Sequence, residues 1–267
     1  MTTLTDPARE LAELCSALAI SSGNPGDHVL AEAFEVEAWS AEFYQIVFCI
    51  VERADSLIAI VSEIDLDEDY RTEAVAHIRQ IKAAFNKGSL MNPWNNRGTG
   101  ASLLAAYNVQ PVKMLSPMVR SRVSYPKLDD VEIDNLIQLA EEFQNWLSTH
   151  QLREQDFIRQ ALLDGIRQFC FRLAKTKWLG WGYTIQSLKD VIAAYKMLEG
   201  GAPGESPQAD AEAVLRKGSA FFVKVFQKLG VAKDAAERAD FLLKAYGAIS
   251  LVQGGTTVTG LLTHLNG

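Results

Sequence analysis

The sequence predicts an all-α protein, built either as an irregular multi-helix bundle or as two packed helical subdomains. Apolar residues recur every three or four positions along most of the 267 residues, as they do on the buried face of an amphipathic helix. Helix-start signals precede several of these stretches, beginning with Asp6 before Pro7. No stretch shows convincing two-residue alternation of apolar and polar side chains, so we expect no substantial strand.

The first part of the chain is expected to hold three helices. Asp6 caps the first helix, which ends at the turn sequence SSGNPG (21–26). The second is a long helix near 27–64, about 55 Å long if unbroken. Its apolar residues recur every seven positions, with Arg53 as the exception in the offset series; the main series is Val36, Phe43, Ile50, Leu57 and Ile64. A third helix follows the acidic turn DLDED and is closed by Gly88.

Composition divides the chain into five parts. A Pro/Gly-rich stretch, GGAPGESP, is the clearest linker, and helical periodicity resumes on both sides of it. The expected parts are an acidic helical part (1–88), a basic irregular connection (89–128), a middle helical part (129–200), a linker (201–208), and a C-terminal helical hairpin and tail (209–267).

The sequence KTKWLGWGYT (175–184) combines three aromatic residues with two glycines. It falls where one helix ends and the next begins. We expect Gly180 or Gly182 to take the left-handed conformation that ends a helix, and Thr184 to cap the next one. Trp178, Trp181 and Tyr183 would then cover the corner, whereas exposed rings would indicate a recognition surface.

Charge is distributed unevenly along the chain. Residues 1–85 hold 16 acidic and 5 basic side chains, whereas residues 86–128 hold six basic side chains and no acidic one. Three interpretations of this basic segment stay open: it neutralises the acidic helices internally, it contacts an acidic protein partner or another copy of the chain, or its NNRGTGAS stretch (95–102) binds a phosphate or nucleic acid. The candidate binding residues are Arg97, Arg120, Arg122, Lys113, Lys127 and Trp94.

Other patterns bear on location and cofactors. The three cysteines lie in apolar helical patterns without CxxC pairing, and no secretory signal is visible, so we expect a reduced, cytoplasmic protein. Membrane contact is not expected; residues 241–265 are the single candidate segment, interrupted by Lys244 and several glycines. The four histidines are far apart and belong to no metal-binding motif, so no metal or other cofactor is expected.

One short motif suggests an enzyme. Arg71 and His77 are separated by five residues, and this spacing resembles the Rx4–6H motif of the all-helical HEPN ribonuclease family. In that family the arginine and histidine act on the scissile phosphate and the 2′-hydroxyl. Here Thr72 follows the arginine, where the family usually has a polar residue with an amide, acid or imidazole. Side chains six positions apart on one helix also point about 120° apart.

Residues 128–200 carry a second resemblance. The segments LDDVEIDNLIQLAEEF, DFIRQALLDGIRQF and GYTIQSLKDVIAAY are similar to helices of uncharacterised bacterial immunity and phage-defence proteins. This resemblance implies a protein that acts by protein contacts in a conflict system, and it supplies no catalytic residue. We therefore expect a non-enzymatic interaction protein, with a HEPN-like ribonuclease or a nucleic-acid binder as the alternative.

Overall fold

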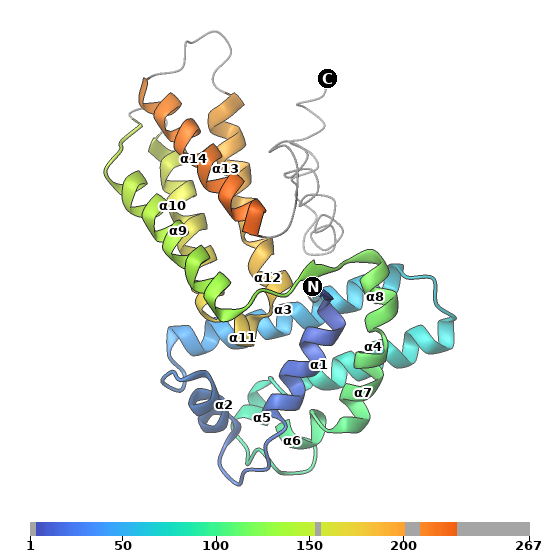
Figure 1. The fold of residues 1–267 in the computed structure, drawn as a ribbon. Helices are drawn as coiled ribbons and strands as arrows, with labels where there is room; N and C mark the ends of the chain where they lie inside the picture. The colour runs from blue at the N-terminus through green and yellow to red at the C-terminus, as the bar shows by residue number, and fades with distance from the viewer. Residues whose placement is uncertain (1–3, 153–155, 201–208, 229–267) are drawn as a thin grey trace.

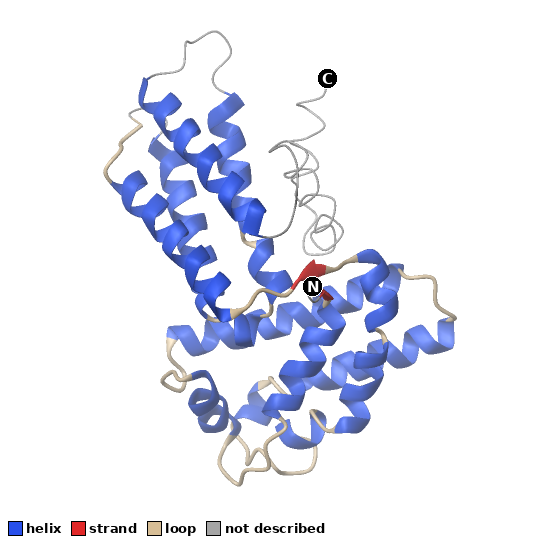
Figure 2. Cartoon of the chain, viewed as in Figure 1, coloured by secondary structure: helices blue, strands red, loops and turns tan. Residues whose placement is uncertain are grey.

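The computed structural model describes residues 4–152, 156–200 and 209–228, and it confirms the all-α fold. A short antiparallel pair, β1 (Leu4–Thr5) with β2 (Tyr125–Pro126), lies among the helices and is red in Figure 2. The helices are α1 (Pro7–Leu18), α2 (Gly26–Phe34), α3 (Ala41–Glu63), α4 (Glu68–Ala83), α5 (Lys87–Leu90), α6 (Gly100–Leu103), α7 (Ala106–Met114), α8 (Ser116–Arg122), α9 (Asp130–Ser148), α10 (Asp156–Ala174), α11 (Thr176–Leu179), α12 (Trp181–Gln186), α13 (Leu188–Gly200) and α14 (Ala209–Lys228).

The helices form two groups that meet near α11 and α12 (Figure 1), the two short helices on either side of Gly180. In the N-terminal body, helix α7 packs between α1 and α4, and α3 packs on α4. In the second group, α10 lies between α9 and α13, and α14 covers α9. The short helices α11 and α12 connect the groups, with α11 resting on α3.

The long helix expected near 27–64 is in fact two helices, α2 and α3. The backbone turns sharply between them because Glu35 and Trp39 both adopt left-handed conformations, with φ of 58° and 63°. Such φ values are uncommon outside glycine. Two side-chain contacts hold the turn: the Trp39 indole donates to Asp27 at 2.6 Å, and the Ser40 hydroxyl accepts from the backbone N–H of Phe43 to cap α3.

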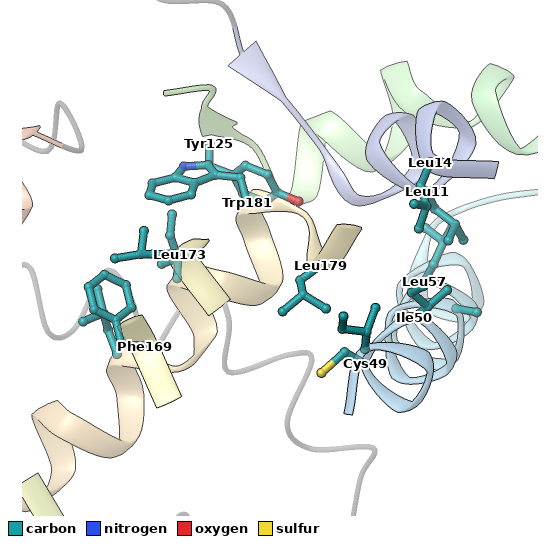
Figure 3. Close-up of a cluster of buried hydrophobic side chains, with 14 of the residues drawn as sticks. Leu11, Leu14, Cys49, Ile50, Leu57, Tyr125, Phe169, Leu173, Leu179 and Trp181 are labelled. Atoms are coloured by element: carbon teal, nitrogen blue, oxygen red, sulfur yellow. The ribbon is translucent and has the colours of Figure 1, made fainter. Parts of the chain in front are cut away.

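The heptad pattern nevertheless identifies the buried face of α3 correctly. Phe43, Ile50 and Leu57 are fully buried in it. Figure 3 shows how the core continues from Leu11 of α1 and Leu57 of α3 to Leu179 of α11. Cys15 and Cys49 are buried in the same core as free thiols, and burial raises the pKa of Cys15 to about 12, so this thiol is protonated near neutral pH.

The basic segment is mostly helical, contrary to the irregular connection that the sequence suggested. Its proline-rich composition concealed four short helices, α5 to α8. The Asn86 side chain caps α5 by accepting from Ser89 N–H at 2.8 Å. Pro117 stands in the first turn of α8, where a missing N–H costs no intrahelical hydrogen bond.

The corner at 175–184 is confirmed as a helix junction. Gly180 has φ of 78° and separates α11 from α12, Trp181 is buried, and Trp178 is half-buried. Thr184, expected to cap a helix, lies inside α12, because the turn at Gly180 already starts that helix at Trp181. The Thr184 hydroxyl instead donates within the junction, to the Gly180 carbonyl at 2.9 Å.

The expected linker (201–208) and the candidate membrane-contact segment (241–265) lie outside the described residues. Of the expected C-terminal helical hairpin, the structure describes α14.

Candidate functional site

Helix α7 has one face in the core and one in solvent. Val109 and Val112 are buried against α1 and α4. On the opposite side, Tyr107 is 64% exposed and Met114 is 74% exposed, and Lys113 is exposed beside them. Large apolar side chains gathered with cations on an exposed surface are more typical of a contact surface than of a solvated helix face.

A loop extends this surface. Ser102 connects the loop to α7, because its hydroxyl accepts from Gly98 N–H and its carbonyl accepts from the Tyr107 hydroxyl, both at 2.8 Å. Arg97, next to Gly98, is exposed. We call the surface formed by Arg97, Tyr107, Lys113 and Met114 the basic face.

The six basic side chains of the segment fall into two groups. Within the described parts of the chain, Lys87, Arg97 and Lys113 form no ion pair and are exposed. The other three turn toward the acidic N-terminal helices. Arg120 pairs with Asp6 at 3.3 Å, Lys127 with Glu13 at 3.7 Å, and Arg122 donates to the Glu63 carbonyl at 3.4 Å.

Arg120 is therefore a structural residue, not the exposed binding residue that the sequence suggested. Its partner Asp6 is fully buried and caps α1, accepting from Ala8 N–H and Arg9 N–H. The second carboxylate oxygen of Asp6 accepts from the Ser116 hydroxyl at 2.6 Å as well as from Arg120. The C-terminal part of the basic segment therefore neutralises acidic side chains of the N-terminal helices within the fold.

Trp94, also a predicted binding residue, is fully buried. Its indole N–H donates to the Leu18 carbonyl at 3.0 Å, and its ring lies against two glycines. A Cβ atom would come within 2.6 Å of the ring at Gly26 and within 2.1 Å at Gly100, so both positions require glycine. Trp94 cannot contact a partner without unfolding this region.

The packing around Trp94 also argues against the interpretation that residues 95–102 bind a phosphate. Gly100 accommodates the tryptophan ring, the Gly98 N–H donates to Ser102, and the Ala101 N–H donates to the Trp94 carbonyl at 2.8 Å. Helix α6, which follows, has only four residues. Two of the amide groups that could contact an anion are thus occupied within the loop, and a third, the Thr99 N–H, donates to the Asn96 carbonyl at 3.2 Å.

Arg71 and His77 both lie on α4, and each is engaged with a different part of the fold. The Arg71 guanidinium donates to Glu68 and to the Leu66 carbonyl at 2.9 Å, at the turn after α3. The His77 ring is 3.1 Å from the Asn108 side chain of α7. Among the described residues, Arg71 and His77 share no hydrogen-bond partner, so this part of the chain does not bring the two side chains together as a ribonuclease site would require.

A cleft that the sequence did not predict lies where the two helix groups meet. It has a volume of about 350 Å³ and is lined by α1, α3, the 127–133 segment and the corner at Gly180. At its base, Glu10 accepts from the backbone N–H groups of Trp181 and Gly182 at 3.1 and 3.4 Å. Arg53 donates to the Trp178 carbonyl at 2.6 Å and stands 3.9 Å from Glu10.

Glycine is required at this base. A Cβ atom at Gly180 would lie 2.5 Å from the Arg53 guanidinium and 2.6 Å from the Glu10 carboxylate. The buried pair Glu10–Arg53 therefore joins the N-terminal body to the corner. In the sequence, only Arg53 indicated this buried pair, because it is the single charged residue in an otherwise apolar heptad series.

Glu10 should make the stability of the fold depend on pH. Burial raises the pKa of its carboxyl above the ordinary 4.5, against the opposing effects of Arg53 and of the backbone hydrogen bonds. A raised pKa means that the folded state retains the proton longer than the unfolded state, so this contribution to stability is complete below pH 4.5 and is lost as pH rises above it.

We expect Glu10→Gln to remove this dependence. The free energy of unfolding, measured by urea titration from about pH 4 to pH 7, should fall less steeply with rising pH in the variant than in the parent. Ser16→Ala, on the exposed side of α1, changes no titratable group; it is the control and should leave the slope unchanged. Identical slopes for Glu10→Gln and the parent would contradict the assignment.

Comparison with protein-family models, with curated proteins and with solved structures finds no match to this chain. Among the residues that the structure describes, no helix is long and apolar enough to cross a membrane. In the same residues, no three His, Cys, Asp or Glu side chains gather as a metal ion would require.

Proposed function

We propose that the protein is a helical interaction protein that binds an acidic protein surface through its basic face. The observation that carries this proposal is the division of the basic segment: Arg97 and Lys113 are exposed and form no ion pair among the described residues, while Arg120 is used inside the fold. Unneutralised cations next to exposed Tyr107 and Met114 combine electrostatic steering with apolar area to bury.

The resemblance of residues 128–200 to bacterial immunity and phage-defence proteins suggests the setting. In this proposal the bundle of α9, α10 and α13 is the scaffold, and the basic face makes the contact in a bacterial defence assembly, as a subunit or regulator. No feature of Arg71 and His77 favours the ribonuclease alternative, because their side chains are engaged separately.

The test reverses two charges on the basic face. The variant Arg97→Glu/Lys113→Glu should keep the melting temperature of the parent within about 2 °C, because exposed charges contribute little to stability. Proteins that co-purify with the parent are identified, and their affinity for each purified chain is then measured at several salt concentrations. We expect at least a tenfold loss for the variant, and an association rate for the parent that falls with salt.

Two controls separate surface charge from folding. Lys196→Glu/Arg216→Glu reverses the same number of exposed charges on α13 and α14 and should bind like the parent. Arg120→Glu places a second carboxylate beside buried Asp6 and should lower the melting temperature clearly. Equal binding by the basic-face variant and the parent would overturn the proposal; salt-dependent binding of an oligonucleotide, or RNA cleavage lost with His77→Ala, would favour the alternative.

A further inference from the structure

The beginning of α3 carries a second exposed apolar surface. Phe43 and Ile46 face the core, whereas Tyr44 is 55% exposed and Phe48 is 61% exposed. These two rings are one helical turn apart on the same side. The half-buried Trp39 extends the surface, with its ring centroid 5.7 Å from that of Tyr44. We call Trp39, Tyr44 and Phe48 the aromatic ledge.

The aromatic ledge is bordered by acidic side chains. Glu35 and Glu37 are exposed in the turn before α3, whereas Glu42, in the first turn of α3, is paired with Lys175 at 2.9 Å. The Trp39–Asp27 hydrogen bond and the Ser40 cap hold this turn, so the carboxylates project from a defined backbone. An acidic border disfavours an anionic lipid surface and favours a cationic protein surface.

The chain itself carries such a cationic surface. The basic face pairs aromatic Tyr107 and flexible Met114 with Arg97 and Lys113, and the segment 86–128 contains no acid. The aromatic ledge pairs two exposed rings with Glu35 and Glu37. The two surfaces thus match in apolar content and are opposite in charge.

One copy cannot bring its own two surfaces together. In Figure 1 the start of α3 lies on the left of the N-terminal body and α7 on its right, with α1 between them. Two different surfaces on opposite sides give a head-to-tail contact, which continues from copy to copy unless the rotation closes a ring.

We propose that a second copy of this chain docks its aromatic ledge on the basic face, so that the protein self-associates head to tail. This inference rests on the proposed function, since it names the acidic partner of the same basic face. Each surface presents only a few large side chains, fewer than the 20 to 30 residues per side, roughly, of a standard interface. The association is therefore expected to be weak and dependent on concentration.

The test uses one variant for each surface. Tyr107→Ala/Lys113→Glu removes the basic face, and Tyr44→Ala/Phe48→Ala removes the aromatic ledge; all four side chains are exposed, so circular dichroism should show folded chains. In sedimentation velocity at rising concentration, the parent should form growing oligomers and each variant alone should remain a monomer. An equimolar mixture should form a one-to-one pair and grow no further, because one intact surface of each kind remains.

Three results would overturn the inference: a parent that is monomeric at every concentration, a variant that still self-associates, or a mixture that does not pair. None of these three results tests the proposed function. That function is tested by a separate measurement, the affinity of a co-purified protein for the basic face. If that protein binds the parent but not Tyr107→Ala/Lys113→Glu while the parent stays monomeric, the proposed function stands and the self-association fails. If it binds both chains equally, the proposed function fails.

Discussion

Replacing Trp94 with alanine is expected to lower the free energy of unfolding by about 3–5 kcal/mol. The side chain is fully buried, so the substitution removes the apolar contacts of a whole indole and leaves a cavity. Two neighbours cannot close that cavity, since Gly26 and Gly100 have no side chains to move into it. The substitution also leaves the Leu18 carbonyl without the indole donor 3.0 Å away.

Urea unfolding of the parent, Trp94→Ala and Trp94→Phe measures this effect. Phenylalanine keeps most of the apolar volume and loses the indole N–H, so it should cost less than alanine. Gly100→Ala should also be destabilising, because its Cβ would overlap the ring. A loss below about 1 kcal/mol for Trp94→Ala would show that the ring is not a core element of the folded protein.

The sequence predicted the elements whose signals are local. The capping residue Asp6 and the stripe from Phe43 to Leu57 are each visible in a few neighbouring residues, and the structure contains both. The middle helical part likewise begins with a local signal, because Asp129 forms a capping box with Glu132 at the start of α9. Local periodicity was sufficient for the fold class and for much of the core.

The break between α2 and α3 could not be predicted in this way. A chain reversal is usually recognised from glycine or proline, whereas here Glu35 and Trp39 adopt the left-handed conformation. What stabilises them is the hydrogen bond from Trp39 to Asp27, twelve residues away. Because the apolar heptad continues through the turn, periodicity alone indicated one long helix.

The candidate site also depends on contacts between distant residues, which local periodicity does not show. The sequence identified the basic segment, but one of its cations, Arg120, is paired, whereas Lys113 forms no ion pair with any described residue, and this division depends on which helix faces α1. Trp94 was predicted as a binding residue, whereas its ring lies against the nearby Gly100 and against Gly26, which is 68 positions away in the sequence. Glu10 and Arg53 are 43 positions apart and meet only through the packing of α1 on α3.

Arg53→Met is expected to be the second large effect, at about 3–5 kcal/mol. Methionine retains the unbranched stem as far as the position of Nε, so the change mainly removes the terminal part of the guanidinium with its charge and hydrogen bonds. It leaves the Trp178 carbonyl without its donor at 2.6 Å and leaves the Glu10 carboxylate buried without its cation. Arg9→Met, the same change at an exposed ion pair on α1, should cost about 0.5 kcal/mol or less.

A double-mutant cycle separates the two causes of that loss. If the unpaired carboxylate is the main cost, then Glu10→Gln should restore much of the stability of Arg53→Met, because a neutral amide can still accept from Trp181 N–H without carrying a buried charge. The coupling free energy between the two positions should then be about 1–3 kcal/mol. Additive losses would instead assign the cost to the Trp178 carbonyl, and the corner would be held by that hydrogen bond alone. Repeating the cycle near pH 4, where Glu10 holds its proton in the folded state, should shrink the coupling, since protonation removes the same charge that Glu10→Gln removes.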